Sequence, residues 1–114
     1  MKLYNTMSRK IEEFVPINSP HVGMYVCGPT VYWSTHIGHM SKYVGDDILR
    51  RVLVYNGYGV KEVMNVTDVG HLTSDADEGE DKMEKGAARE GISVWDIAKK
   101  YEEEFFDTMD ALNV

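Results

Sequence analysis

The order of apolar and polar positions in this chain of 114 residues predicts a strand followed by a helix. Residues 22–27 form a short apolar run that stops at Gly28 and Pro29, as is typical of a buried strand. Apolar residues then recur at helical spacing, which indicates an amphipathic helix packed on a sheet. The apolar stripe of this helix comprises Met40, Val44, Ile48, Leu49, Val52 and Leu53.

A second strand is predicted after this helix. The Asn56-Gly57 pair should end the helix, and apolar residues between positions 58 and 67 indicate the strand. Strand, helix and strand in this order make a βαβ unit with parallel strands. Ligands of such folds bind beyond the carboxyl ends of the strands, where Cys27 and Thr67 both lie. The pattern therefore predicts an α/β fold with a binding site near these two residues.

The last third of the chain predicts two more helices. Residues 81–89 form a short one, and Ser93 begins a longer one in which Asp96 completes a capping box. The long helix carries an apolar stripe of Ala98, Tyr101, Phe105, Met109 and Leu112, and Trp95 is expected in the core. Part of the stripe should rest on the βαβ unit, and apolar surface left uncovered would favour self-association.

Between the second strand and the short helix, residues 70–80 are acidic and hold two glycines, as is typical of an exposed loop. Asp75, Asp77 and Gly79 faintly resemble a calcium-binding loop, but the twelve-position pattern with its final glutamate is not met. We therefore interpret this segment as a solvated loop.

Charge and cysteine content narrow the function classes. The net charge of −7 argues against a main docking surface for nucleic acid, because polyanion binding needs a basic face. A single cysteine forms no internal disulfide, which suits a reducing cytoplasm. The sequence shows neither a signal-peptide pattern nor an apolar run long enough to span a bilayer, so we expect a cytoplasmic protein without membrane contact.

The block from Cys27 to His39 carries the candidate chemistry. Ser34 or Thr35 should act as the N-cap of the helix, which puts His36 and His39 in its first turn. A helix N-terminus has free N–H groups and partial positive charge, so it favours phosphate. The two imidazoles, three positions apart, point to the same side. The block therefore predicts a nucleotide site.

Gly38 lies between the two histidines and has no side chain, which would let a planar base approach the backbone. The other readings of these residues are structural. Cys27 alone could be a small buried residue, and His36 and His39 could be ordinary helix-cap residues. Thr67 and Asp68 could simply close the strand through hydrogen bonds from side chain to backbone. We expect Tyr32 and Trp33 in the core or in a pocket wall, and His21, Lys42 and His71 on the surface.

Five stretches resemble, in order and spacing, the N-terminal part of the cysteinyl-tRNA synthetases, a family of class I aminoacyl-tRNA synthetases. They are Leu3-Tyr4-Asn5-Thr6, residues 24–32 (Met-Tyr-Val-Cys-Gly-Pro-Thr-Val-Tyr), the HIGH tetrapeptide at 36–39, residues 64–69 (Met-Asn-Val-Thr-Asp-Val) and the closing Met109-Asp110-Ala111-Leu112-Asn113. A lone HIGH tetrapeptide would be weak evidence for this family, but five stretches in the right order over nearly the whole chain are strong evidence.

The resemblance implies the first half of a Rossmann-like (HUP-type) parallel-sheet nucleotide-binding fold, followed by helices. It also implies a ligase of protein biosynthesis that joins L-cysteine to ATP as cysteinyl-adenylate, with magnesium accompanying ATP, and transfers the cysteinyl group to tRNA(Cys). Residue by residue, Cys27 falls on the first zinc ligand, Gly28, Thr30 and Thr67 on the cysteine pocket, and Thr30, Thr35, His36, Ile37, Gly38 and His39 on the ATP site.

The expected chemistry explains these residue types. Cysteine and serine differ mainly by one atom, so coordination of the substrate thiolate by zinc discriminates between them better than shape does. Adenylate formation needs no protein nucleophile, because the substrate carboxylate attacks the α-phosphate and the protein supplies positioning and charge stabilisation. We therefore expect the catalytic role of His36 and His39 to be transition-state binding.

Residues 1–114 are expected to be one piece of a synthetase catalytic domain. Residues 1–69 would hold the strand, HIGH helix and strand, and residues 70–114 the loop and helices that lead into the insertion. The sequence lacks the other three zinc ligands, the KMSKS loop and the anticodon-binding domain, so we expect the isolated chain to be inactive. Two alternatives stay open: an inactive nucleotide-binding fragment, and a related ligase that joins cysteine to a sugar amine.

Overall fold

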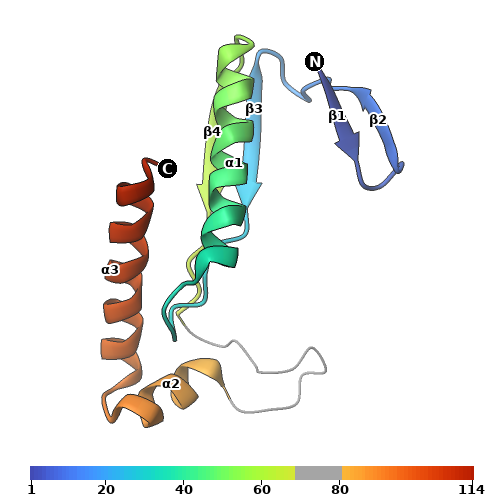
Figure 1. The fold of residues 1–114 in the computed structure, drawn as a ribbon. Coiled ribbons are helices and arrows are strands. Elements are labelled where there is room, and N and C mark those ends of the chain that lie inside the picture. Colours follow the sequence, from blue (N-terminus) through green and yellow to red (C-terminus); the bar gives the residue numbers. More distant parts are fainter. Residues whose placement is uncertain (69–80) are drawn as a thin grey trace.

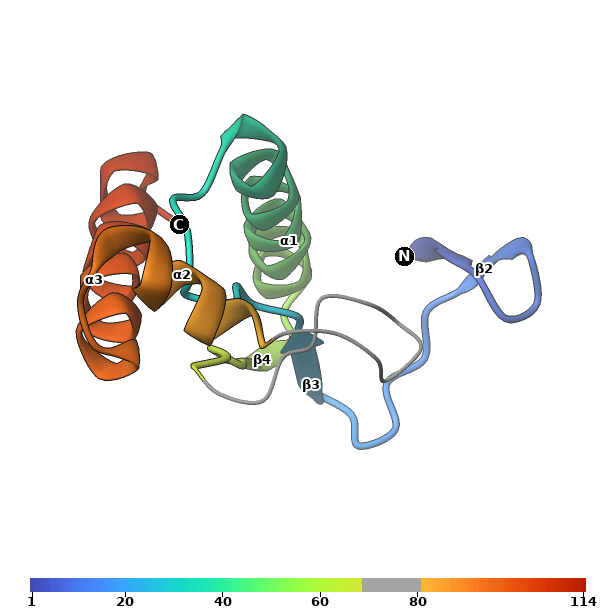
Figure 2. The ribbon, with the colours of Figure 1, turned by 90° about the horizontal axis from the view of Figure 1, so that it is seen from below.

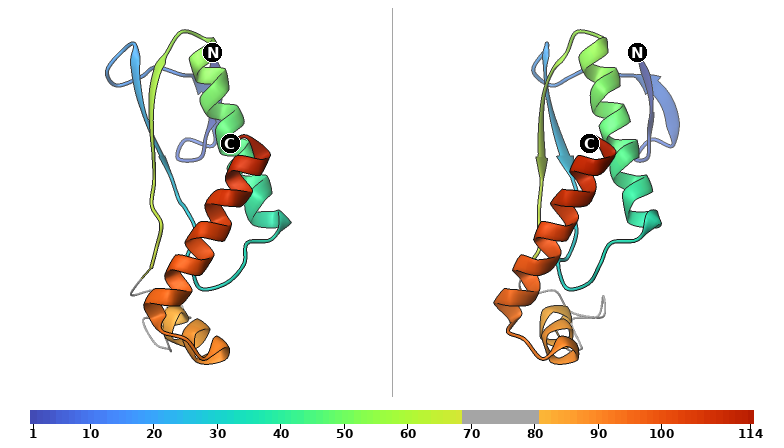
Figure 3. Two further views of the ribbon diagram at one scale, coloured as in Figure 1. Left: turned by 90° about the vertical axis from the view of Figure 1, so that its left-hand side faces the viewer. Right: turned by 60° about the vertical axis from the view of Figure 1, so that its left-hand side comes forward.

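The fold is built around two parallel strands and the helix that connects them. The computed structural model describes residues 1–68 and 81–114. Strand β3 (His21–Val26) pairs in parallel with β4 (Gly59–Met64), and helix α1 (Ile37–Tyr55) connects them. Figures 1 and 3 show α1 lying alongside the two strands. The predicted α/β class and βαβ unit are therefore confirmed.

An antiparallel hairpin precedes this central unit. Strands β1 (Lys2–Asn5) and β2 (Lys10–Glu13) pair along their whole length. The hairpin projects to one side of the central unit (Figures 1 and 2), and nearly all its side chains are exposed. Just beyond β2, the ring of Phe14 meets that of Tyr58 edge to face, with centroids 5.6 Å apart. This contact ties the hairpin to the turn before β4.

Two helices complete the described chain. Helix α2 (Lys82–Glu90) ends at Gly91, whose φ of 68° lies in the left-handed region that favours glycine. Helix α3 (Val94–Leu112) begins after Ser93, whose Oγ accepts from the Asp96 N–H at 3.1 Å. The Asp96 carboxylate accepts from the Ser93 hydroxyl at 2.7 Å. Both predicted helices are therefore confirmed, and Ser93 is the cap.

Helix α3 joins two hydrophobic clusters. The first cluster lies between α3, α1 and the strand ends and contains Val26, Met40, Tyr43, Phe105 and Met109. The second cluster lies between α3, α2 and the loop after β3 and contains Val31, Met83, Ala87, Ile97, Ala98 and Tyr101. The predicted stripe of α3 therefore does rest partly on the βαβ unit, and only its last member, Leu112, is exposed.

Three apolar side chains that were predicted to be buried are exposed. Ile48 and Val52 of α1 are 56% and 40% exposed, because a sheet of two strands is too narrow to cover the whole stripe. Trp95 is 71% exposed. It lies two positions before the fully buried Ile97, about 200° around the helix, and so it faces away from the core.

Two expectations concern the acidic loop and the membrane. The predicted loop at residues 70–80, with its rejected calcium pattern, lies outside the described residues. The surface position expected for His71 lies outside them as well. Of the helices that the structure describes, none combines the length and the apolar character needed to cross a bilayer.

Candidate active site

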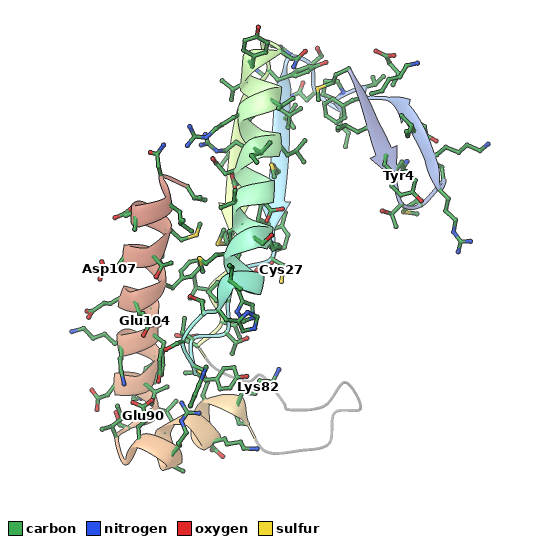
Figure 4. All side chains as sticks on the ribbon, viewed as in Figure 1. Tyr4, Cys27, Lys82, Glu90, Glu104 and Asp107 are labelled. Atoms are coloured by element: carbon green, nitrogen blue, oxygen red, sulfur yellow. The ribbon has the colours of Figure 1, made fainter. Side chains whose placement is uncertain are left out.

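A pocket of about 320 Å³ lies where the loop after β3 meets the first turn of α1. It is lined by Gly28, Pro29, Thr30, Tyr32, Trp33, Ser34, Thr35, His36, His39 and Tyr43. This is the carboxyl end of the parallel strands, and Figure 4 shows Cys27 beside the same end of α1. Most of the predicted ATP residues therefore come together here. Cys27, Ile37, Gly38 and Thr67 border the pocket without lining it.

His36 is the N-cap of α1, so the prediction of Ser34 or Thr35 is wrong. The backbone of His36 is extended, and its ring Nδ1 accepts from the Gly38 N–H at 3.1 Å. The Nδ1 of His39 accepts from the His36 N–H at 3.2 Å, and the two rings stack with centroids 3.8 Å apart. The cap was mispredicted because an imidazole nitrogen here does what a hydroxyl or carboxylate oxygen does at most N-caps.

These two bonds determine which ring nitrogen carries the proton. A neutral imidazole has one donor nitrogen and one acceptor nitrogen. Because Nδ1 accepts in both rings, Nε2 carries the proton in both, and each histidine offers an Nε2–H donor. Burial, and then the neighbouring His36, lower the pKa of His39, which favours its neutral form. The structural reading is therefore correct in part: both histidines cap the helix, and the cap orients their rings.

Asn65, just after β4, organises the ends of the strands. Its side-chain oxygen accepts from the Gly28 N–H at 3.0 Å and from the Tyr25 hydroxyl at 2.9 Å. Its amide nitrogen donates to the Thr67 hydroxyl at 3.1 Å. A Cβ on Gly28 would lie 1.7 Å from the Asn65 carbonyl oxygen, so this position requires glycine for close packing. Sequence reasoning missed Asn65 as a site organiser, although a polar residue directly after a buried strand was the available signal.

Thr30 and Thr67 face each other in a short parallel bridge beyond the two strands. The Val31 N–H donates to the Thr67 carbonyl at 3.0 Å, and the Thr67 N–H donates to the Pro29 carbonyl at 2.9 Å. Backbone bonds, rather than the expected bonds from side chain to backbone, therefore hold Thr67 at this end of the sheet, and its hydroxyl accepts from the Asn65 amide. The same bridge holds Thr30 in the pocket lining.

Cys27 is exposed and its thiol is free, so the alternative of a small buried residue is wrong. Its carbonyl accepts from the Lys42 ammonium at 2.6 Å, and Lys42 also pairs with Asp46 at 2.7 Å. Lys42 is at the surface as expected, but it also anchors the backbone beside the thiol. Burial, and then the proximity of Cys27 and Asp46, raise the pKa of Tyr43 to about 12, so Tyr43 keeps its proton.

The described part of the chain does not form a complete metal site. Within residues 1–68 and 81–114, no three His, Cys, Asp or Glu side chains are grouped to hold a metal ion. Protein zinc sites use at least three protein ligands. The accessible soft sulfur of Cys27 suits zinc as one ligand, but these residues alone do not form the site.

Two side chains of the C-terminal helices hold the pocket wall. The guanidinium of Arg89 lies 3.3 Å from the ring centroid of Trp33 and donates to the Tyr32 carbonyl at 3.1 Å. The Ser34 hydroxyl donates to the Glu104 carboxylate at 3.2 Å. Trp33 is half exposed and lines the pocket, which confirms the predicted wall position. Arg89 and Glu104 were not predicted, because no local pattern marks them.

A second hollow, of about 350 Å³, lies at the opposite end of β3. Its lining is mainly apolar and is formed by residues 14–18 and 21–23. It contains none of the HIGH residues and lies at the amino end of the strand, so the candidate active site is the pocket at the HIGH turn.

Comparison with known proteins identifies the family to which the chain belongs. A family model described as the catalytic domain of class I (C) tRNA synthetases matches residues 13–114. The chain belongs to this synthetase family. It is 59% identical over 114 residues to cysteine–tRNA ligase 1 of Burkholderia lata, covering all of this chain and 24% of that protein. It is 53% identical over 112 residues to the cysteine–tRNA ligase of Deinococcus radiodurans, covering 98% of this chain and 22% of that protein.

The resemblance drawn from the five stretches is therefore confirmed for this synthetase chain. Another relative is the cysteine–tRNA ligase of Novosphingobium aromaticivorans, 49% identical over all of this chain and 23% of that protein. The chain spans about a quarter of the length of the curated relatives it matches. The family match begins at Glu13, the last residue of β2, so it includes the βαβ unit and leaves out nearly all of the hairpin.

Proposed function

We propose that this chain supplies the ATP-binding and cysteine-binding part of a cysteine–tRNA ligase. The complete enzyme would activate L-cysteine with ATP to cysteinyl-adenylate, release pyrophosphate and transfer the cysteinyl group to tRNA(Cys). The observation that carries the proposal is the stacked pair His36 and His39, at the N-terminus of α1 and in the lining of the pocket. Relatives named cysteine–tRNA ligases support the choice of amino acid and acceptor.

Both histidines are suited to binding negative charge. As the substrate carboxylate attacks the α-phosphate and pyrophosphate leaves, charge develops on the phosphate oxygens, and ATP would carry magnesium with it. Two Nε2–H donors and the positive end of α1 would stabilise that charge. Neither ring has a free lone pair for a base, because Nδ1 accepts a backbone N–H and Nε2 carries the proton. Their proposed role is therefore transition-state binding.

The remaining site residues take proposed roles around this pair. Thr30, Thr35, Ile37 and Gly38 would hold ATP with the two histidines, and Gly28, Thr30 and Thr67 would border the bound cysteine. A Cβ on Gly38 would lie 2.9 Å from the His36 ring, so glycine leaves room for the folded-back imidazole. Cys27 would give one zinc ligand, and the zinc would discriminate cysteine from serine by binding its thiolate. The other ligands would come from outside the described residues.

A catalytically inactive nucleotide-binding piece is the second candidate function. The incomplete metal site of the described residues and the quarter-length match to the relatives favour this candidate for the chain on its own. Ligation of cysteine to a sugar amine has less support, since the matching relatives are named for tRNA. In either case we place the protein in the cytoplasm. We further propose that the isolated chain self-associates through exposed apolar residues such as Ile48 and Phe106.

Cysteine-dependent ATP–pyrophosphate exchange tests the proposal in two proteins. The first is the 114-residue chain, with zinc content measured on the same sample. The second is a chimera in which the chain replaces the matching segment of the Burkholderia lata ligase. We expect little exchange and no stoichiometric zinc for the chain alone, and exchange plus tRNA charging for the chimera.

Variants of the chimera provide the controls. His36→Ala and His39→Ala should each reduce exchange, and Cys27→Ala should lower zinc content as well. A chimera that folds and shows the same exchange rate with and without the two imidazoles would contradict the proposed site. Exchange by the chain alone would show that the second candidate is wrong.

A further inference from the structure

The segment that leads from β3 into the HIGH turn is held by helices far away in the sequence. Val31 is buried in the second cluster, among side chains of α2 and α3. Tyr32 packs against the same cluster, and a Cβ on Gly86 of α2 would lie 2.9 Å from the Tyr32 carbonyl oxygen. Helix α2 therefore approaches the backbone of this segment closely. The segment ends at Ser34, and His36 lies only two residues further along the chain.

Arg89 makes the polar part of this attachment. Its guanidinium covers the Trp33 ring at 3.3 Å from the centroid, and the same group donates to the Tyr32 carbonyl at 3.1 Å. The next residue, Glu90, pairs with Lys100 at 2.5 Å and accepts from the Tyr101 hydroxyl, which fastens the end of α2 to α3. Arg89 therefore lies at the end of α2 that is bonded to α3, and it contacts two residues of the pocket wall, Tyr32 and Trp33.

We propose that Arg89 is a positioning residue for the nucleotide pocket: it holds the Tyr32–Trp33 wall in the conformation that accepts ATP. This inference rests on the proposed function of the pocket. Arg89 itself does not line the pocket, so its effect on a ligand would pass through Trp33 and the Tyr32 backbone. Sequence distance makes the attachment informative, since Arg89 and Tyr32 are 57 positions apart.

Because the bonds of the histidine cap are local, the positioning role of Arg89 can be distinguished from a general role in folding. In the part of the chain that the structure describes, the cap bonds of His36, Gly38 and His39 join atoms of the first turn of α1, so loss of Arg89 should leave the cap intact. The wall, in contrast, loses a cation–π contact and a charge-assisted hydrogen bond. Removal of Arg89 should therefore loosen residues 31–34 more than it loosens α1.

The test compares Arg89→Met and Arg89→Lys with Lys85→Ala in the 114-residue chain. Lys85 is an exposed cation on the same helix, one turn earlier, and serves as the matched control for lost charge. Trp95→Phe in every protein leaves Trp33 as the only tryptophan, so its fluorescence reports the wall without any ligand. Hydrogen exchange of peptides spanning residues 28–40 and 94–112 separates local loosening from global unfolding, and ATP binding is measured by titration.

We expect Arg89→Met to change Trp33 fluorescence, to speed exchange in residues 28–40 only, and to weaken ATP binding roughly 3- to 30-fold. Arg89→Lys should recover part of the affinity, and Lys85→Ala should match the parent. Unchanged exchange and fluorescence in Arg89→Met would overturn the proposal. So would a loosened wall with unchanged ATP affinity. If the parent chain binds no ATP, the proposed function fails, and exchange and fluorescence still decide whether Arg89 holds the wall.

Discussion

Helices α1 and α3 have the same length, 19 residues, but their first turns are capped in different ways. Helix α3 has a serine cap, whose hydroxyl accepts from a backbone N–H, and Ser93 does not line the pocket. Helix α1 has a histidine cap, in which two imidazoles satisfy two backbone N–H groups and keep their Nε2–H donors for a ligand. The comparison indicates that the first cap stabilises the fold, and that the second also orients two imidazoles in the lining of the pocket where we propose that ATP binds.

The two helices also differ in what they bury. Helix α3 buries five side chains, none of them charged, and reaches both hydrophobic clusters. Helix α1 buries Asp47, which pairs with Arg50 and Arg51, each at 2.5 Å, while Ile48 is left exposed. Burial acts to raise the pKa of Asp47, but its bonds to the two arginines outweigh that effect and hold the pKa below its usual value. Most of the stability should therefore come from α3, and most of the chemistry from α1.

Truncation of a core residue of α3 should have the largest effect on stability. Phe105 is 1% exposed and packs edge to face on Tyr43 of α1. Phe105→Ala should destabilise the chain by about 3–5 kcal/mol, because a cavity replaces the ring. Phe106→Ala, at the half-exposed neighbouring position, is the matched control and should cost far less. Urea unfolding followed by circular dichroism measures both. Equal losses for the two variants would contradict the conclusion that α3 stabilises the fold through the buried ring of Phe105.

Removal of the imidazoles of α1 should affect ligand binding more than stability. His36→Ala and His39→Ala should each slow ATP–pyrophosphate exchange by the chimera about 100- to 1,000-fold, as expected when a donor to developing charge is lost. Stability should fall by no more than the roughly 1 kcal/mol of a lost cap. The measurement pairs exchange rates with urea unfolding of the same proteins. A large loss of stability with normal exchange would reverse the assignment of roles.

Removal of the serine cap of α3 should lower stability and leave ATP binding unchanged. Ser93→Ala should cost about 1 kcal/mol, because the Asp96 N–H loses its acceptor. ATP affinity should stay at the parent value, since Ser93 does not line the pocket. Ser93→Asp, which keeps an acceptor at the cap, should restore the stability. Thermal melts and ATP titrations of the three proteins would show whether the structural cap is independent of the site.

The smallest effect should be a pH dependence of the histidine cap. The pKa of His39 is lowered in the folded chain, so the folded state binds the proton less readily than the unfolded state does. This contribution to stability is complete above the unfolded value of about 6.5 and is lost as pH falls from there through the folded value. Protonation also ends the bond from the His36 N–H to Nδ1, because imidazolium nitrogens only donate.

Urea midpoints at pH 7.5 and 5.5, with NMR titration of the His39 ring, measure this effect. His39→Gln is the control, since glutamine at this position can complete a capping box without titrating in this range. The fall in stability between the two pH values should be smaller in His39→Gln than in the parent. A His39 pKa at or above the ordinary value would show that the cap does not favour the neutral ring.

Local patterns accounted for the βαβ unit and for the last two helices, whereas the hairpin of β1 and β2 was not predicted. The apolar run before Gly28, the helical stripe and the Asn56-Gly57 stop correctly predicted β3, α1 and their parallel partner β4. The cap at Ser93 was predicted correctly as well. Each of these signals is contained in a few consecutive residues, so no knowledge of packing was needed. The HIGH residues were also found this way, although the true cap, His36, was taken for a residue of the first turn.

The sequence by itself determined the family, the βαβ unit and the residues of the HIGH turn, because periodicity, turn formers and motifs are local properties. Only the tertiary structure decided that Trp95 faces solvent, that Lys42 binds the Cys27 carbonyl and that Arg89 covers Trp33. These outcomes depend on which face of one helix meets another element, and that is set by how all the apolar surfaces can be buried together. The pocket wall belongs to this second class, since its two supports come from α2 and α3.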